Sequence, residues 1–594
     1  MTPNSPAPPA PGPVPGSGRG AASGSGSGPG TGPVPGPGRG AGPGRRSFLA
    51  STAVAAAAAA GGVPLLAACG GGAREQRKDG ATSGRDAAGI LPAYVPQEIV
   101  KPDIPARNGS SAGFTTAVPP ERLRTSVPRR LGRGGTVRIM APLWGSPPPG
   151  GNAWYRAMDE AIGVTTRWQN QDGNTYDEKL GAVLASSGIP DVVVVPGWNL
   201  TGRIPGAVNA KFADLGPYLS GDRVKEYPNL AAVPTDAWQR AIFGGALRGI
   251  PMPASYVVNI VPYYRQDLFE ERGYEVPGSA GEFLAWAKEA TSAKAKVWAC
   301  DDMKWTAFHA FGVLPGSDRA LWWNTVDGRL VNRVETEEYL EALEWVRKLY
   351  AANVVHPDAR AQNQGDAGNR FTSGQVLVYN NDLSHWYTKS VEQAGQNPDF
   401  RMGGMDVFGH DGSAPRLFAQ QPANMFTFVS EKAPEPVVRD FLAVADFCAA
   451  PYGTKERLLT DYGVAGVHHT LSGGMPVKND TGHLQVTGAF DLVGDPAPYL
   501  AHPDRPDLVE AQVEWQQRMG AHTVKTPFYG LTVTEPSRWA NLADDFEQLE
   551  DDVVRGRKKI GDVQQAVSEW RSRGGDRLRD WYRGLLDDTG SAAN

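Results

Sequence analysis

Apolar and polar positions follow two alternating periods from residue 136 onward. Residues 136–140, TVRIM, form a β-branched and apolar run that predicts a strand, residues 153–162 have helical spacing, and residues 164–168 predict a second strand. Strand-like and helix-like segments then keep alternating along the chain. This order is typical of α/β proteins, so we expect an α/β fold.

The clearest unit of this pattern spans residues 175–195. Thr175 and Glu178 have the spacing of a capping box at a helix start, and Gly188 suits the position after the helix. Four consecutive valines, residues 192–195, form the kind of apolar run that is buried on both faces of a parallel sheet. We therefore expect a helix followed by a buried strand.

Further elements are expected downstream. Ser279 and Glu282 again have capping-box spacing before a helix. The other expected elements are helices within residues 337–351, 436–449, 539–553 and 563–570, and a strand within residues 371–379.

The start of the chain lacks this periodicity. Residues 1–44 are almost entirely Gly, Pro, Ser and Ala, which offer no apolar side chains for a core. Arg45 and Arg46 precede a mostly alanine run that ends in the sequence LAAC at Cys69. This arrangement resembles a bacterial twin-arginine export signal that ends in a lipobox, whose cysteine is acylated. The alternative is an alanine-rich linker with a chance cysteine.

The alanine run is not expected to span a membrane, because Gly61, Gly62 and Pro64 interrupt it. We expect residues 1–68 to be a leader with a removable signal peptide and residues 69–133 to be a flexible tether. The expected location is the extracellular face of the cell membrane, with the lipid on Cys69 as anchor.

Charge and cysteine content narrow the class of protein. The chain has 59 Lys and Arg against 64 Asp and Glu. Four of the arginines lie within residues 1–68, so the mature chain has a formal net charge of −9. This balance argues against nucleic acid as a partner. Only Cys300 and Cys448 follow Cys69, and we expect two buried free thiols rather than a disulfide scaffold.

Several segments, taken in order, resemble the extracellular solute-binding proteins of ABC importers, the family that includes maltose-binding protein and related saccharide receptors. The resemblance covers residues 136–585. Its segments are YDEKLGAVLASSGIPDVVVVPG, FADLGPYL, RGIPMPASYVVNIVPYYRQDLFEERGYEVPGSAGEFLAWA, LEWVRKLYAANVVHPDA, FTSGQVLVYN, DYGVAGVHHTL and FEQLEDDVVRGRKKIGDVQQAVSEWRSRGGDRL.

This resemblance implies a two-lobed α/β fold of the type II periplasmic-binding-protein kind, with discontinuous lobes joined by hinge segments. The implied lobes are residues 134–255 with 425–475, and residues 256–424 with 476–594. Hinges use short stretches at element ends that absorb backbone change. By analogy, the chain is expected to cross between lobes near residues 253–261, 418–425 and 471–477.

The resemblance also implies a function. A monomer without a cofactor would capture a saccharide, expected to be an oligosaccharide, between its lobes and deliver it to an ABC permease in the membrane. No H-E-x-x-H, P-loop or G-x-S-x-G motif is present, so we do not expect an enzyme. Two alternatives stay open: a surface-anchored lyase or hydrolase of carbohydrates, and a receptor for a peptide or another solute.

A saccharide site needs flat aromatic surfaces for the apolar faces of sugars and polar groups for their edges. Trp144 and Trp198 follow the ends of two expected strands, where ligands sit in open α/β sheets. Each candidate has a structural alternative, such as core packing for a tryptophan or helix capping for Asn381 and Asp382. The predicted ligand contacts are Trp144, Trp198, Asn199, Tyr256, Trp305, Trp322, Trp323, Asn381, Asp382, Trp386, Gln421 and Asn424.

The adjacent His468 and His469 invite comparison with a metal site. Neighbouring side chains on a strand point to opposite faces, and no third ligand has a recognisable spacing. We therefore expect these histidines to pack in the structure, and no metal site.

Overall fold

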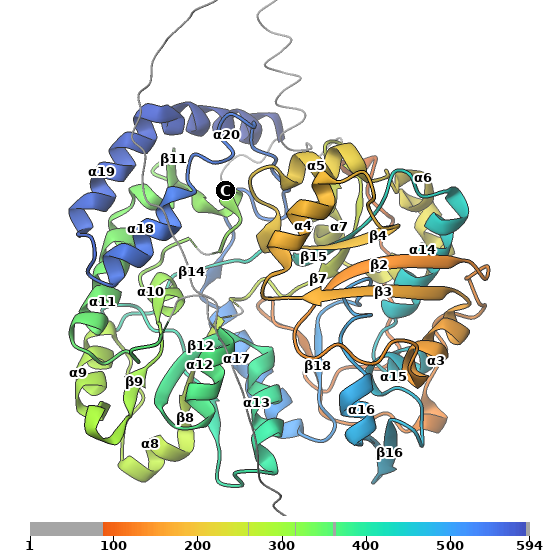
Figure 1. Cartoon of the computed structure of the whole chain (residues 1–594), viewed down its shortest axis with the longest axis horizontal. Coiled ribbons are helices and arrows are strands. Elements are labelled where there is room, and N and C mark those ends of the chain that lie inside the picture. Colours follow the sequence, from red (N-terminus) through yellow and green to blue (C-terminus); the bar gives the residue numbers. More distant parts are fainter. Residues whose placement is uncertain (1–86, 259, 315, 360–363, 590–594) are drawn as a thin grey trace, which may run out of the picture. The chain divides into compact units, whose positions relative to one another are not determined.

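Two β-sheets organise the chain (Figure 1). The computed structural model describes residues 87–589, except 259, 315 and 360–363, and these residues belong to one compact unit, Ala67–Asn594. One sheet has five strands in the order β3-β2-β4-β15-β7, and the other has four in the order β13-β8-β12-β9. The five-stranded sheet carries one hydrophobic cluster, which we call the first core. The four-stranded sheet carries two clusters, which together we call the second core.

The five-stranded sheet is mixed rather than wholly parallel. β2 pairs in parallel with β3 and β4, whereas β15 runs antiparallel to both β4 and β7. The four valines of β4 are fully buried, so the expected buried strand is confirmed. The strands are β2 (Thr136–Leu143), β3 (Thr165–Asp172), β4 (Val192–Pro196), β7 (Gly249–Pro253) and β15 (Ala423–Val429).

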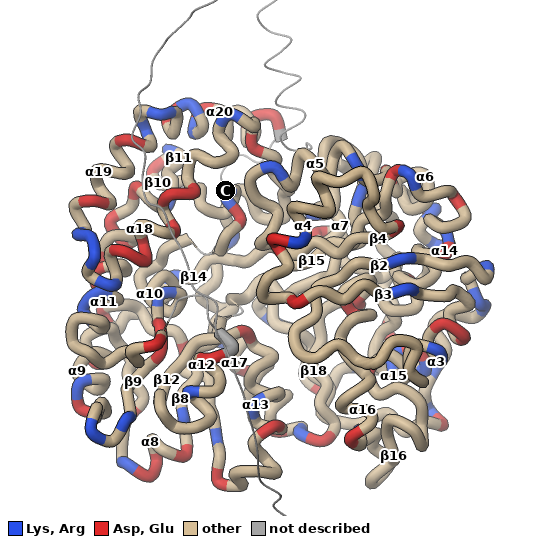
Figure 2. The backbone as a smooth tube through the Cα atoms, viewed as in Figure 1, with Lys and Arg blue, Asp and Glu red and all other residues tan. Residues whose placement is uncertain are grey.

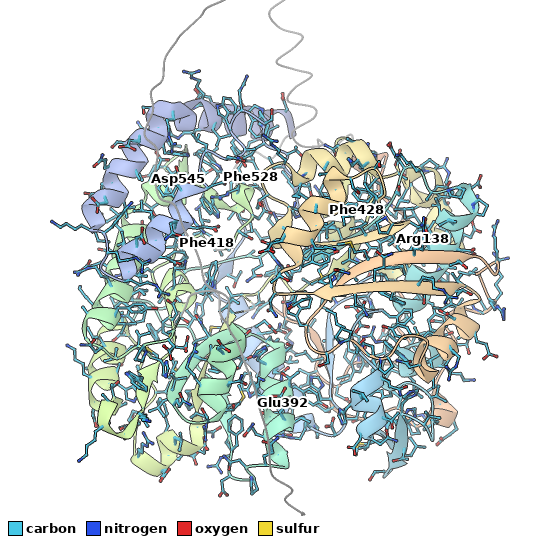
Figure 3. The ribbon with its side chains drawn as sticks, viewed as in Figure 1. Arg138, Glu392, Phe418, Phe428, Phe528 and Asp545 are labelled. Atoms are coloured by element: carbon cyan, nitrogen blue, oxygen red, sulfur yellow. The ribbon has the colours of Figure 1, made fainter. Side chains whose placement is uncertain are left out.

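Helices cover this sheet and complete the first core. In α3 the Asn152 side chain accepts from the Tyr155 amide at the start, and Gly163 ends the helix with φ of 84°. Phe428 of β15, which is labelled in Figure 3, packs in the same core against Phe212, with ring centroids 5.3 Å apart. The helices are α3 (Ala153–Ile162), α4 (Tyr176–Ala185), α5 (Ile204–Lys211), α6 (Gly216–Leu219), α7 (Thr235–Arg240), α14 (Glu435–Cys448), α15 (Lys455–Tyr462) and α16 (Asp480–Gln485).

Helix α4 forms where expected and starts after Thr175 as predicted, but the predicted capping bond does not form and the helix ends before Gly188. Thr175 is the N-cap, yet its side chain makes no capping bond, since its backbone (φ −123°, ψ 17°) is not in the extended conformation that aims a cap at the first turn. The helix ends at Ala185, and Ser186 rather than Gly188 terminates it by bonding to the Val183 carbonyl. The cap at Ser279 does form and accepts from the Glu282 amide.

The four-stranded sheet lies between two hydrophobic clusters, one containing Leu377 and Val378 and the other Val376 and Tyr379. Its strands are β8 (Ile260–Arg265), β9 (Trp298–Cys300), β12 (Val376–Asp382) and β13 (Met402–Gly404). Its helices are α8 (Gln266–Arg272), α9 (Ala280–Ala290), α10 (Lys304–Ala310), α11 (Glu337–Ala351), α12 (Gln364–Thr372), α13 (Ser384–Ala394), α17 (Pro506–Gly520), α18 (Asp545–Val554), α19 (Ile560–Trp570) and α20 (Asp576–Thr589).

Short two-stranded pairings complete the described structure. They are β1 (Ala112–Phe114) with β18 (Tyr499–Ala501), β5 (Ile242–Phe243) with β6 (Ala246–Leu247), β10 (Trp323–Val326) with β11 (Arg329–Asn332), β14 (Leu417–Phe418) with β19 (Thr523–Val524), and β16 (His469–Ser472) with β17 (Met475–Lys478).

The chain crosses between the sheets at two of the three expected places. It leaves the five-stranded sheet at Pro253 and enters the other at Ile260, and it returns between β14 and β15. The third expected crossing is wrong, because residues 471–477 form an exposed antiparallel hairpin. Beyond this hairpin Val486, Phe490 and Val493 still pack in the first core, and the second core resumes at Leu508.

Residues 87–133 run along the folded body, although the sequence analysis assigns them to a tether. Ala87 is buried in the first core, Pro92 bridges to Gly221, and β1 pairs in parallel with β18. We call residues 87–133 the N-terminal strap. The expected lipid site at Cys69 and the paired arginines at 45 and 46 lie outside the described residues.

Charged residues are spread over the surface rather than gathered by sign. Figure 2 shows basic and acidic residues alternating along α20. Cys300 and Cys448 are both free and buried, as predicted. In the part of the chain that the structure describes, no helix combines the length and apolar character needed to span a membrane.

Candidate functional site

The most accessible aromatic pair is formed by Trp144 and Trp198. Because β2 and β4 run in parallel, their carboxyl ends reach the same edge of the sheet, and each tryptophan follows one of these ends. The ring centroids are 6.0 Å apart with the planes tilted by 55°. Each side chain is 46% exposed. We call this pair the aromatic platform.

A glycine after the neighbouring strand makes room for the platform. A Cβ atom on Gly173, which follows β3, would lie 2.4 Å from Cε2 of Trp144. The Gly173 amide also donates to the Leu143 carbonyl. The ends of three adjacent parallel strands therefore fix the position of Trp144.

Two asparagines, Asn199 and Asn424, lie near the platform. Asn199 follows Trp198 by one residue, and its buried Oδ1 has no hydrogen-bond partner among the described residues. Asn424 is half-buried, and its carbonyl would be 2.9 Å from a Cβ atom on Gly197. The platform therefore consists of two accessible aromatic rings with two asparagines close by.

A second aromatic group lies at the crossing between the sheets. Tyr256 and Tyr529 have ring centroids 6.1 Å apart in an edge-to-face arrangement. Lys525 Nζ lies 4.8 Å from the Tyr256 ring centroid and 4.1 Å from that of Tyr529. Tyr529 Oη donates to Asp236 at 2.9 Å. Burial, together with this carboxylate, raises the pKa of Tyr529.

Gln421 uses its amide within the protein. Its Nε2 donates to Asp318 Oδ2 at 3.0 Å, and its Oε1 accepts from the Gly530 amide at 2.8 Å. The same Asp318 oxygen accepts from Arg240. In this structure Gln421 therefore belongs to a polar network that joins α7 to loops of the second core.

Asn381 and Asp382 at the end of β12, and Trp386 in α13, make contacts within the protein. Asn381 is 1% exposed, and its Oδ1 accepts from the Asp382 amide. Asp382 accepts from both the amide and the hydroxyl of Ser384, the first residue of α13, although the N-cap of this helix is Leu383. Trp386 is buried against Tyr263, with ring centroids 5.8 Å apart.

Trp322 and Trp323 lie in the second core, each 1% exposed. Trp323 packs against Tyr582, with ring centroids 5.1 Å apart. Trp322 Nε1 donates to the Gly316 carbonyl. Neither ring is accessible in this structure, whereas the nearby Trp305 is half-buried.

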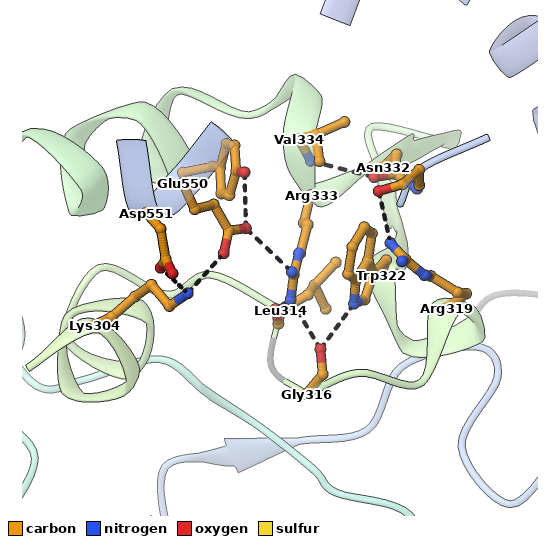
Figure 4. Close-up of polar contacts among 12 residues, drawn as sticks. Lys304, Leu314, Gly316, Arg319, Trp322, Asn332, Arg333, Val334, Glu550 and Asp551 are labelled. Carbon is orange, nitrogen blue, oxygen red and sulfur yellow. Dashed lines mark hydrogen bonds and ion pairs between the residues drawn. The ribbon is translucent and has the colours of Figure 1, made fainter. Parts of the chain in front are cut away.

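Trp322 adjoins a buried ionic network that fastens α18 to the second core (Figure 4). The Arg333 guanidinium lies 3.5 Å from the Trp322 ring centroid and reaches Glu550 at 3.4 Å. Glu550 also accepts from Lys304 at 3.2 Å. Buried charges need such partners, so this network has a structural role.

The two adjacent histidines pack as predicted. His468 Nδ1 accepts from the Val464 amide at 2.9 Å, and His469 Nδ1 lies 2.9 Å from the Tyr462 carbonyl. Both are nearly fully buried. Within the described ranges, no three His, Cys, Asp or Glu side chains are grouped as metal ligands.

Sequence reasoning missed the partners at the crossing: Arg240, Asp318, Lys525 and Tyr529. Residues 525–529, KTPFY, have no periodicity, and nothing in the sequence places them beside Tyr256. The only available signal was a lysine and an aromatic residue flanking a proline in a loop.

Comparison with known proteins decides the family. A family model described as bacterial extracellular solute-binding protein matches residues 153–481, which is more than half of the chain. This chain belongs to that family. The solute-binding protein is also 21% identical over 359 residues to the lipoprotein LipO of Bacillus subtilis (strain 168), covering 57% of this chain and 68% of that relative.

Solved structures agree on the fold of this solute-binding protein. The alginate-binding protein AlgQ2 matches with a TM-score of 0.59 and 15% identity, over 78% of this chain and 100% of that one. The N-glycan transport solute-binding protein NgtS of Streptococcus pneumoniae matches with a TM-score of 0.55 and 14% identity, over 77% of this chain and 99% of that one. The predicted two-lobed α/β fold of type II is therefore confirmed.

Proposed function

We propose that this solute-binding protein captures a saccharide of oligosaccharide size between its two lobes and delivers it to an ABC permease. The observation that carries the proposal is the aromatic platform, in which Trp144 and Trp198 remain accessible at the carboxyl ends of adjacent strands. Aromatic rings stack on the apolar faces of sugars, and Asn199 and Asn424 supply polar edges. Neighbours of similar fold include an alginate-binding protein, an N-glycan transport protein and a substrate-binding protein in complex with kestose.

The proposed receptor is a monomer held at the outer face of the membrane by a lipid on Cys69. The sequence LAAC and the preceding Arg45 and Arg46 support this location, as does the name of the LipO relative. We propose that the lobes close around the ligand. The ligand raises the population of the closed state only to the extent that it binds this state more tightly than the open state.

The test is a panel of oligosaccharides, with thermal unfolding as the readout. A ligand at 100 times its Kd stabilises the folded state by about 2.7 kcal/mol, and a micromolar Kd corresponds to roughly −8 kcal/mol of binding free energy. We expect stabilisation by one or a few glycans. No stabilisation by any glycan would contradict the proposal, whereas stabilisation by peptides alone would favour a peptide receptor.

The same samples separate a receptor from a carbohydrate-active enzyme. A receptor returns its ligand unchanged, so no new reducing ends should appear when the protein is incubated with polysaccharides. Accumulation of reducing ends or of unsaturated products would support a hydrolase or lyase instead.

A further inference from the structure

We call the five-stranded sheet with the first core the first lobe, and the four-stranded sheet with the second core the second lobe. The N-terminal strap begins on the first lobe. Ala87 is buried in the first core, and the Ala93 and Val95 amides donate to the carbonyls of Gly221 and Ala231 at 3.0 and 2.8 Å. These backbone contacts hold the first dozen described residues against the helical turns that follow α6.

The middle of the strap then docks on the second lobe. Asn108 Nδ2 donates to the Gln517 carbonyl, and Gln517 Nε2 donates to the Pro105 carbonyl, both at 3.1 Å. The Ser111 amide donates to Gln516 Oε1 at 2.9 Å. Both glutamines lie on α17, whose Trp515 and Met519 pack in the second core. The strap begins on the first lobe, and its middle is hydrogen-bonded to helix α17 of the second lobe.

At its turning point the strap meets the crossing between the lobes. Gly109 has φ of +79°, and a Cβ atom there would lie 2.1 Å from Cζ of the Tyr256 ring. Ser255 Oγ donates to the Gly109 carbonyl at 2.7 Å. Only glycine fits this left-handed position under the ring. Tyr256 belongs to the segment between β7 and β8, so the strap contacts one of the two crossings directly.

The strap finally returns to the first lobe. The rings of Phe114 and Tyr452 pack with centroids 4.4 Å apart. The Ser126 amide donates to Glu456 Oε1 at 3.1 Å, and the Arg133 amide donates to Asp440 Oδ1 at 2.8 Å. Both ends of the strap are thus fixed to one lobe while its middle is fixed to the other.

We propose that the strap is a brace that restrains hinge motion and thereby sets the conformational equilibrium of the ligand site. The inference rests on the proposed function, because it assigns regulation to that same site. Movement of the second lobe relative to the first either carries the middle of the strap away from its fixed ends or breaks its contacts with α17 and Tyr256. The apparent affinity for ligand depends on the fraction of molecules in the competent arrangement, so the strap tunes affinity without touching the ligand.

The test measures the distance between the lobes in the ligand-free full chain. Fluorescent labels are placed at Asp222→Cys in the first lobe and Glu338→Cys in the second, both exposed positions, in a Cys69→Ser background. Cys300 and Cys448 are buried and do not compete for label. The single-molecule distance distribution is then compared between the wild-type strap and its variants.

Gly109→Ala is the decisive variant, and Gly134→Ala is its matched control. Both glycines have positive φ, but a Cβ atom on Gly134 meets nothing within 4 Å. We expect Gly109→Ala to raise the fraction of molecules away from the wild-type distance by about tenfold, as loss of one or two hydrogen bonds would. Gly134→Ala should leave the distribution unchanged.

A gentler variant covers the case in which Gly109→Ala does not fold. Asn108→Gly combined with Gln517→Ala removes two exposed hydrogen bonds to α17 without a clash, and it should broaden the distribution in the same direction. An unchanged distribution in the folded variants, with only a lower melting temperature, would overturn the brace. Since no ligand is added, this result is independent of whether any saccharide binds the wild-type protein.

Discussion

Arg240 of α7 and Asp318 of the second core form an ion pair, in which Nη2 donates to Oδ2 at 2.5 Å. The Arg240 side chain is 5% exposed and that of Asp318 is 22% exposed. Arg240 Nη1 also donates to the Leu531 carbonyl at 3.0 Å and to Thr532 Oγ1 at 2.6 Å. The hydrogen-bond partners of Nη1 and Nη2 of this first-lobe guanidinium thus belong to the second lobe, while its buried Nε has no partner among the described residues.

We expect Asp318→Asn to destabilise the protein by about 3 kcal/mol, because it leaves a buried guanidinium without its counter-charge. The measurement is urea unfolding at pH 7. The control is Glu270→Gln, which breaks an ion pair with Arg401 whose side chains are each more than half exposed, and should cost about 0.5 kcal/mol. Equal effects of the two substitutions would contradict a special role for the Arg240 pair.

Replacing either tryptophan of the platform should weaken saccharide binding. Trp144→Ala and Trp198→Ala each remove a stacking surface, and we expect Kd to rise about tenfold or more, the equivalent of at least 1.4 kcal/mol. The melting temperature of the ligand-free protein should change little, since each ring is 46% exposed. Calorimetric titration measures the affinity.

The matched control for the platform is Tyr94→Ala. Tyr94 is 52% exposed, and the strap is held here by the backbone amides of Ala93 and Val95, which Tyr94→Ala leaves in place. Its removal should therefore leave Kd unaltered. A loss of affinity in Tyr94→Ala equal to that in the tryptophan variants would point to a general effect of removing surface aromatics.

Stability should fall as pH rises because of Asp446 in α14. Burial, with a smaller contribution from Glu456, raises the pKa of this carboxyl to about 7 against the opposing effect of the Leu230 and Asn229 amides. The folded state therefore keeps a proton that the unfolded state loses near pH 4. This contribution is fully present below pH 4 and is lost as pH rises toward 7.

Asp446→Asn isolates this effect, because an amide keeps the acceptor for both backbone amides without ionising. Compared with the wild-type protein, we expect the variant to be similar in stability at pH 5 and more stable at pH 8, by a difference on the order of a few kcal/mol. Urea midpoints at the two pH values check the sign. A variant that loses stability equally at both would show that Asp446 is not the titrating group.

The two buried free thiols should not react with thiol reagents until the protein unfolds. Cys300 and Cys448 are fully buried, and burial raises the pKa of each thiol, so neither is a reactive thiolate. In unacylated full chain we expect a chromogenic thiol reagent to modify at most Cys69 under native conditions and two further thiols in denaturant. Rapid modification of a second thiol in the native state would contradict their enclosure.

The sequence predicted elements well where hydrophobic periodicity was continuous. Val192–Val195 formed the buried strand, and residues 436–449 closely matched α14. The capping bond at the start of α4 did not form as predicted, because local spacing does not report the backbone angles at Thr175. The third crossing was misplaced because a proline in a hairpin and a proline in a hinge look alike in sequence.

From the sequence, the proximity of candidate site residues could be predicted only for those that follow the ends of neighbouring parallel strands. Trp144 and Trp198 meet because a parallel pair brings its carboxyl ends together, a rule that needs no long-range information. Trp322, Trp323 and Trp386 followed strands or loops in the same way, yet they found aromatic partners in the core. Which side of an element a tryptophan faces depends on packing from distant segments such as α20, and the local sequence does not encode this.

The position at which the packed strap begins limits how far the folded body can lie from the proposed lipid anchor. Seventeen residues, 70–86, separate the proposed lipid-bearing Cys69 from the buried Ala87. Even fully extended, that many residues reach at most about 60 Å. Under the proposed anchoring, the folded body stays in a thin layer above its own membrane, and the proposed transfer of ligand takes place with permeases in the adjoining bilayer.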